Sequence, residues 1–135
     1  MSKTWEGVIG VENKQTVDGR FVDPGAIVWD EGTPIPLYLS GPDGLGMQLI
    51  GVVEGVWRDG YLLKARGDFR PEFELSDLHE DVRALGMELD SVIFTREEGE
   101  GVESLYLHEG RLRRVCLYNG TKPAWPECRI EVIGS

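Results

Sequence analysis

Residues 47–69, MQLIGVVEGVWRDGYLLKARGDF, contain two apolar runs on either side of the tripeptide Arg58-Asp59-Gly60. An Asp-Gly pair favours a tight turn because both positions tolerate positive φ angles. The flanking stretches, residues 47–57 and 61–69, are rich in side chains that favour strands. We therefore predict a β-hairpin, which is the clearest local feature of the sequence.

Short apolar runs punctuated by glycine continue on both sides of this hairpin, as expected for strands joined by turns. We expect a first strand at residues 4–12 and later strands at residues 89–94, 103–108, 112–118 and 129–133. Residues 30–46 contain three prolines, which cannot donate to a sheet, so this segment is predicted to be an extended edge or a long loop.

One helix is predicted near residues 76–86, where apolar residues recur at helical spacing ahead of Gly86. Strands far outnumber this helix. The expected fold is therefore a single domain, residues 1–135, of the mostly β (α+β) class. Its expected architecture is a closed or half-closed antiparallel β-barrel with one principal helix.

The composition excludes several classes of protein. The chain has 24 acidic and 14 basic residues among 135, a net charge of −10, and such a surface repels nucleic acid. No apolar run approaches the roughly 20 residues of a membrane-spanning helix, and residues 1–6 lack the apolar core of a signal peptide. Without a secretion signal, Cys116 and Cys128 are predicted to be reduced, buried thiols rather than a disulfide.

The sequence contains none of the common catalytic or phosphate-binding motifs. Its two histidines, His79 and His108, do not lie at metal-ligand spacing from a cysteine. We therefore expect no metal site and no cofactor. Either histidine could act as a general base only beside a nucleophile, and the sequence places none there.

The order of several short motifs resembles the prohead (capsid maturation) serine proteases of tailed phages, whose fold is similar to herpesvirus assemblin. The resemblance spans nearly the whole chain. It rests on residues Trp5-Glu6-Gly7, Asp18-Gly19-Arg20, Pro24-Gly25-Ala26-Ile27-Val28-Trp29, Pro34-Ile35-Pro36-Leu37, Gly67-Asp68-Phe69, Gly110-Arg111-Leu112, Pro123-Ala124-Trp125 and Glu127-Cys128-Arg129-Ile130.

The resemblance implies a nucleophilic serine and a histidine base, and this chain lacks both at the corresponding positions. Glu88 stands where the serine is expected, and the expected place of the histidine falls at residues 43–45, Asp-Gly-Leu. A serine hydroxyl without a base is almost unreactive. Ser91, combined with His79 or His108, remains as an alternative, rearranged site.

The favoured interpretation is a degenerate member of that family without catalytic residues. It predicts a minor capsid or decoration (cement) protein that binds and stabilises the shell of the major capsid protein. We expect it on the virion, at the outer surface of the capsid, and in the cytoplasm of the host bacterium during assembly. The sequence does not decide whether the chain forms a homo-oligomer on the capsid. Neither nucleic acid nor membrane is an expected partner.

The residues predicted to contact the capsid lie in irregular segments and carry large apolar or aromatic side chains: Ile35, Leu37, Tyr38, Leu39 and Trp125. Ordinary packing in the core is the competing interpretation for each of them. Two other functions also remain: an active capsid maturation endopeptidase with a rearranged serine site, and a regulatory module that acts only during assembly.

Overall fold

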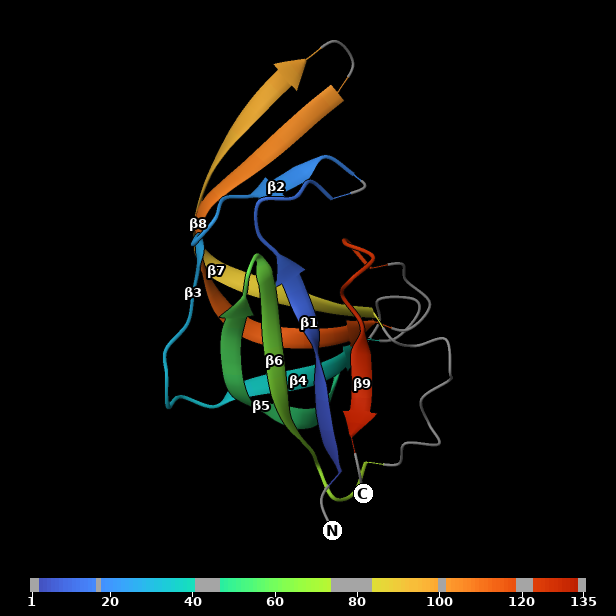
Figure 1. Ribbon diagram of the computed structural model, residues 1–135. Coiled ribbons are helices and arrows are strands. Elements are labelled where there is room, and N and C mark those ends of the chain that lie inside the picture. Colours follow the sequence, from blue (N-terminus) through green and yellow to red (C-terminus); the bar gives the residue numbers. More distant parts are fainter. Residues whose placement is uncertain are drawn as a thin grey trace.

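The computed structural model describes residues 3–16, 18–40, 47–73, 84–99, 102–118 and 123–133 (Figure 1). Within them the secondary structure consists of nine strands, which belong to one sheet. They are β1 (Thr4–Val11), β2 (Arg20–Val22), β3 (Ile27–Val28), β4 (Ile35–Ser40), β5 (Met47–Asp59), β6 (Leu62–Phe69), β7 (Ala84–Gly99), β8 (Val102–Tyr118) and β9 (Ile130–Ile133).

The predicted hairpin is confirmed as β5 and β6, which pair antiparallel from Gly51–Phe69 to Asp59–Leu62. The turn lies one residue later than predicted, because β5 extends through Asp59 and leaves Gly60 and Tyr61 as the loop. Gly60 has a φ of 62°, a left-handed conformation that glycine adopts without the steric cost of a Cβ. The mainly β class of the fold is also confirmed.

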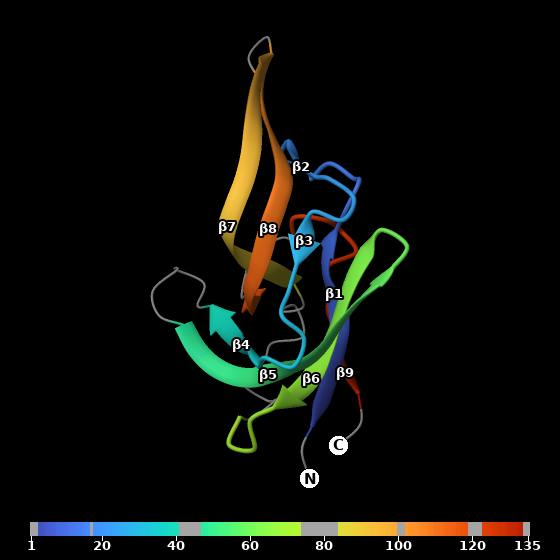
Figure 2. The same cartoon turned by 90° about the vertical axis from the view of Figure 1, so that its left-hand side faces the viewer.

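The expected barrel is wrong, because the sheet does not close. Its strands follow the order β2-β8-β4-β5-β6-β1-β9, with β3 and β7 also paired to β8. An isolated bridge joins Ala84 to Arg129 near the start of β7, but one bridge is not a continuous ladder. The strong twist of the long strands curls the sheet around its core without joining its two ends (Figures 1 and 2).

The predicted helix near residues 76–86 is not supported by the part of the chain that the structure describes. Residues 76–83 lie outside the described residues, and Ala84, Leu85 and Gly86 open β7. Ala84 and Leu85 are buried, and Leu85 packs in the hydrophobic core. Apolar residues four positions apart occur in irregular strands as well as in helices. Their spacing alone therefore does not distinguish a helix from a strand.

Within the proline-rich segment, residues 35–40 form an internal strand rather than an edge or a loop, while residues 41–46 lie outside the described residues. β4 pairs antiparallel with β5 and parallel with β8. The described pairing with β8 begins at Leu37, so Pro36 pairs only with Val52 of β5. Its missing N–H therefore removes no hydrogen bond from the β4–β8 ladder.

The core lies on the concave side of the curled sheet. Its largest fully buried side chains include Trp5 and Ile9 of β1, Leu37 of β4, Ile50 of β5 and Leu63 of β6. The predicted thiols are confirmed as free and buried. Within the described residues, no helix is long and apolar enough to cross a membrane.

Strand β8 organises the half of the molecule that contains the candidate site. One side of it pairs with β7 along the full hairpin, while the other side pairs in turn with β2, β3 and β4, all parallel to it. The distal half of the β7–β8 hairpin extends well beyond the other strands, as both views show (Figures 1 and 2).

Candidate functional site

We call the projecting part of the β7–β8 hairpin the arm and define it as residues 90–99 and 102–110. The pairing of β7 with β8 slips three times between Glu88 and Phe94, and Ser91 adopts a φ of 52°. Such bulges bend a hairpin and increase its twist. The irregularity therefore marks the point where the arm leaves the core.

The arm exposes three consecutive large apolar side chains. Val92, Ile93 and Phe94 are 45%, 56% and 50% exposed. Because successive residues of a regular strand point to opposite faces, Phe94 and its neighbour Ile93 present apolar surface on both sides of β7. Exposed apolar residues that cluster in this way are typical of a binding surface.

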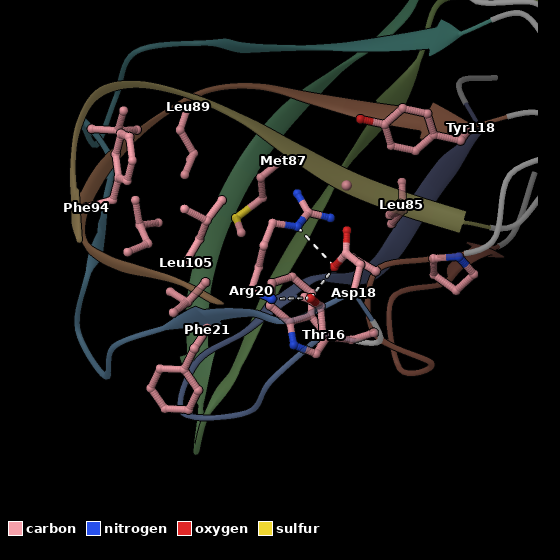
Figure 3. A pocket seen from close by; sticks show the side chains of 17 residues that line it. Thr16, Asp18, Arg20, Phe21, Leu85, Met87, Leu89, Phe94, Leu105 and Tyr118 are labelled. Carbon is pink, nitrogen blue, oxygen red and sulfur yellow. Dashed lines mark hydrogen bonds and ion pairs between the residues drawn. The ribbon is translucent and has the colours of Figure 1, made fainter. Parts of the chain in front are cut away.

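A cavity of about 540 Å³ lies beneath the arm. We call it the arm cavity (Figure 3). Most of its lining is apolar and comes from β7, β8, β2 and the segment before β9, including Leu89, Phe94, Leu105, Leu107 and Trp125. Figure 3 shows Leu89, Phe94 and Leu105 gathered together on one side of it. Its size and apolar character match those of ligand sites, which span about 300–1,000 Å³.

A small polar cluster also lines the arm cavity (Figure 3). The Thr16 hydroxyl donates to the carboxylate of Asp18 and accepts from the Arg20 backbone N–H at 2.9 Å. The Arg20 Nε lies 3.2 Å from Asp18 Oδ1. The hydrogen bond from Thr16, together with the hydrogen bond and charge of Arg20, outweighs a small desolvation effect and lowers the pKa of Asp18. The cluster therefore presents a charged pair rather than a free cation.

Glu88, the residue at the position where the resemblance predicts a nucleophilic serine, is held in an ion pair. Arg114 Nε lies 3.1 Å from Glu88 Oε2, and the Cys116 thiol lies 3.8 Å from the same oxygen. Burial, together with the Glu88 charge, raises the pKa of Cys116 to about 11, so this thiol is not an activated nucleophile at neutral pH. Residues 43–45, where the base is expected, lie outside the described residues.

His108 lies in a hydrogen-bonded trio with Thr95 and Asp23. Its Nε2 is 2.8 Å from Thr95 Oγ1 and its Nδ1 is 2.6 Å from Asp23 Oδ2. Both ring nitrogens are thus engaged, and neither is left for Ser91. His79, the other histidine of the rearranged site, lies outside the described residues.

The trio has the hydroxyl–imidazole–carboxylate order of a catalytic triad, but catalysis also requires a substrate cleft and donors for an oxyanion. The side chains of His108 and Asp23 are 39% and 37% exposed, and the trio does not line the arm cavity. Its direct structural effect is to connect β7 and β8 of the arm to the segment between β2 and β3. Among the described residues, no three His, Cys, Asp or Glu side chains gather to hold a metal ion.

The structure distributes the predicted contact residues between the core and a half-buried strand. Ile35, Leu37 and Trp125 are 7%, 0% and 6% exposed and pack in the core. Tyr38 and Leu39 are half-buried on β4. Buried side chains offer no contact area in this conformation, so the competing interpretation of core packing describes the first three.

Trp125 alone among these residues lines the arm cavity, and its indole Nε1 donates to the Lys14 carbonyl at 2.8 Å. Sequence reasoning missed the exposed apolar residues of the arm, Val92, Ile93 and Phe94. A run of three apolar residues is more typical of a buried strand, so only their place on a projecting hairpin identifies them.

Comparisons with protein-family models, with curated proteins and with solved structures give no match for this chain.

Proposed function

We propose that this chain is a non-catalytic structural protein of a tailed-phage particle, a minor capsid or decoration protein that binds the shell of the major capsid protein through its arm. The observation that carries the proposal is the arm itself, whose Val92, Ile93 and Phe94 are about half exposed. Apolar surface open to water is unfavourable, and a partner that covers it would stabilise the complex. The arm is therefore suited to a permanent partner.

The state of Glu88 supports a role without catalysis. Its carboxylate pairs with Arg114 across the β7–β8 ladder, in register with that residue. A carboxylate can act as a nucleophile in other enzymes, but this one is engaged by a cation and a thiol outside the lining of the arm cavity. The contact instead ties the two strands together at the base of the arm.

The net charge supports a position on the outer surface of the capsid. A charge of −10 is repelled by packaged DNA, which carries about one negative charge per 1.7 Å of helix axis. During assembly the protein would reside in the cytoplasm of the host bacterium. Attachment to the shell needs no nucleic acid, membrane or cofactor.

The test is sedimentation of the full chain with empty capsid shells purified from the phage that encodes it. We expect the chain to pellet with shells in a saturable, fixed ratio and to be present in mature particles by mass spectrometry. A chain that stays in the supernatant at all shell concentrations would refute the proposal. Binding to precursor shells with absence from mature particles would instead support the assembly-stage regulatory module.

The trio of Thr95, His108 and Asp23 favours the endopeptidase alternative, because it pairs a hydroxyl with an imidazole and a carboxylate. That alternative predicts cleavage of the capsid precursor that is lost in His108→Ala. Incubation of the two proteins followed by intact-mass measurement decides between the functions. An unchanged precursor mass rejects the enzyme, and a shortened precursor rejects the non-catalytic proposal.

A further inference from the structure

We infer that the outer edge of β7 accepts an extended segment of the shell protein as an added strand. In this arrangement, apolar side chains at alternate positions of the segment enter the arm cavity, and basic side chains flank them. The inference rests on the proposed function and specifies how the arm would hold its partner.

The first observation is the open edge of β7. In the part of the chain that the structure describes, β7 forms a ladder only with β8, and the bridge from Ala84 to Arg129 is confined to its start. Through the arm, the backbone N–H and C=O groups on the other side of β7 pair with no strand among the described residues. Such a row is a template for a further strand, and main-chain hydrogen bonds would supply affinity.

The second observation is the position of the arm cavity next to this edge. Val92 and Phe94, two residues apart on β7, both line the cavity. Phe94 lies opposite Leu107 of β8, which lines it too. An added strand would continue the same pleat, so every second side chain would lie on the cavity side. A volume of about 540 Å³ has room for more than one apolar side chain.

The third observation is the charge around this edge. Asp90, Glu97 and Glu98 lie on β7 and Glu109 lies on β8, all of them exposed. Arg96 is the basic residue of the β7 arm segment. Opposite charges on neighbouring strands attract, so a partner segment with lysine or arginine beside its apolar residues fits better than an acidic one.

The same charges argue against a second copy of this chain as the occupant. Two antiparallel β7 strands related by a twofold axis near Phe94 would place Glu98 of one copy opposite Asp90 of the other. Glu97 would lie opposite Ser91, next to that aspartate. Like charges directly opposite each other destabilise a strand pair. A strand from a different, basic protein avoids this repulsion.

The test combines hydrogen exchange with two matched substitutions in the full chain. Bound to empty capsid shells, the backbone amides of residues 90–98 are expected to exchange at least tenfold more slowly than in the free protein. Phe94→Lys is expected to weaken shell binding at least tenfold. Tyr61→Lys is the control, because Tyr61 is equally exposed, at 55% against 50%, but lies on the β5–β6 loop. It should bind like the wild type.

The outcomes separate this inference from the proposed function. Shell binding without protection of residues 90–98 overturns the added strand and leaves the capsid role standing. No shell binding refutes both. Protection that appears in the free protein as its concentration rises, together with a dimer in sedimentation velocity, identifies a second copy and also overturns the inference. The exchange measurement uses the wild type, so it decides even if Phe94→Lys fails to fold.

Discussion

The substitution Glu12→Gln tests the contact that holds β3 against β1. Glu12 is 1% exposed and follows β1, yet it carries a carboxylate. Arg58 Nε donates to its Oε1 at 2.8 Å, Arg58 Nη2 to its Oε2 at 3.1 Å, and the Ile27 backbone N–H to Oε2 at 3.3 Å. Arg58 Nη2 also donates to the Ile27 carbonyl, so three strands meet here. The guanidinium further lies 5.0 Å from the centre of the Trp29 ring.

The expected cost follows from these contacts. Glutamine keeps the size of the side chain but removes the charge and turns an amide donor toward a cation. Two charge-assisted hydrogen bonds are worth about 1.5 kcal/mol each. Because the Arg58 side chain is 35% exposed, water screens part of the pair, and we expect a loss of about 2 kcal/mol. For a chain of this length, that loss lowers the Tm by about 8 °C.

The dependence on pH gives an independent check. Burial alone would raise the pKa of Glu12, but hydrogen bonds from Arg58 and from the backbone N–H groups of Gly25 and Ile27 outweigh it and lower the pKa below 4.5. A lowered pKa in the folded state adds stability above pH 4.5, and this stability is lost as the pH falls through the folded-state value. The difference in Tm between the wild type and Glu12→Gln should therefore be largest near pH 7 and become smaller below pH 4.5.

Thermal unfolding followed by circular dichroism measures both effects, with Glu127→Gln as the matched control. Glu127 also pairs with a cation, Lys14 at 2.8 Å, but the two side chains are 34% and 50% exposed. A surface ion pair of this kind stabilises the folded state by about 0.5 kcal/mol. Equal Tm losses in the two variants, or a gap for Glu12→Gln that widens in acid, would refute the assignment of Glu12 as a buried structural anion.

Three further substitutions or reagents test the core. Leu37→Ala should reduce the free energy of unfolding in urea by about 3 kcal/mol, because this side chain is fully buried; a loss under about 1 kcal/mol would contradict its place in the core. Burial raises the pKa of Cys116 and Cys128 to about 11 and about 12, so iodoacetamide at pH 8 should leave the folded protein unmodified and label both thiols in denaturant. An adduct on the folded chain, detected by mass, would count against this. In Gly67→Ala the added methyl would collide with the Val52 carbonyl oxygen of the facing strand. Its Tm should fall by the equivalent of about 2 kcal/mol, and an unchanged Tm would mean that β5 and β6 are farther apart.

Local signals in the sequence predicted the elements that depend on neighbouring residues. The β5–β6 hairpin carries its own turn residue, Gly60, and two alternating runs, so its pairing needs no distant partner. The first and last strands, β1 and β9, also lie where the apolar runs predicted them. The ends of β1, β5, β6 and β9 differ from the predicted ends by at most two residues, as expected when the ladder rather than the composition sets the boundary. The strand predicted at residues 89–94 is longer, as β7, and the two strands predicted at residues 103–108 and 112–118 are one strand, β8.

The long-range pairings of β8 could not be predicted in the same way. Nothing near residues 105–117 indicates that three separate segments pair with this strand in parallel. Because the sequence does not reveal the pairing of β4 with β8, the prolines around Ile35 indicated an edge strand. In the structure β4 has a neighbouring strand on each side. Leu85 likewise fitted a helix by spacing, but its backbone N–H donates to the Cys128 carbonyl at 3.1 Å. Partners this distant override local preference.

The same limit applies to the candidate site. Trp125 was predicted to contact the capsid, but its side chain is buried and lines the arm cavity. Phe94 was not predicted, since one sequence cannot reveal that a hairpin continues past the core. The site arises where β2, β7 and β8 come together, which is a property of the topology.

The bracing of the arm explains how an exposed apolar hairpin can be ready to bind. β2 runs parallel to β8 along Leu105–Leu107, and the Asp23 backbone N–H donates to the Leu107 carbonyl at 3.0 Å. The side chains of Asp23 and His108 add a contact at 2.6 Å. This side-chain contact is exposed and therefore contributes little by itself, so the backbone ladder must supply most of the rigidity. A partner strand would then meet a surface that is already ordered, and association would lose less conformational entropy than binding to a loose hairpin.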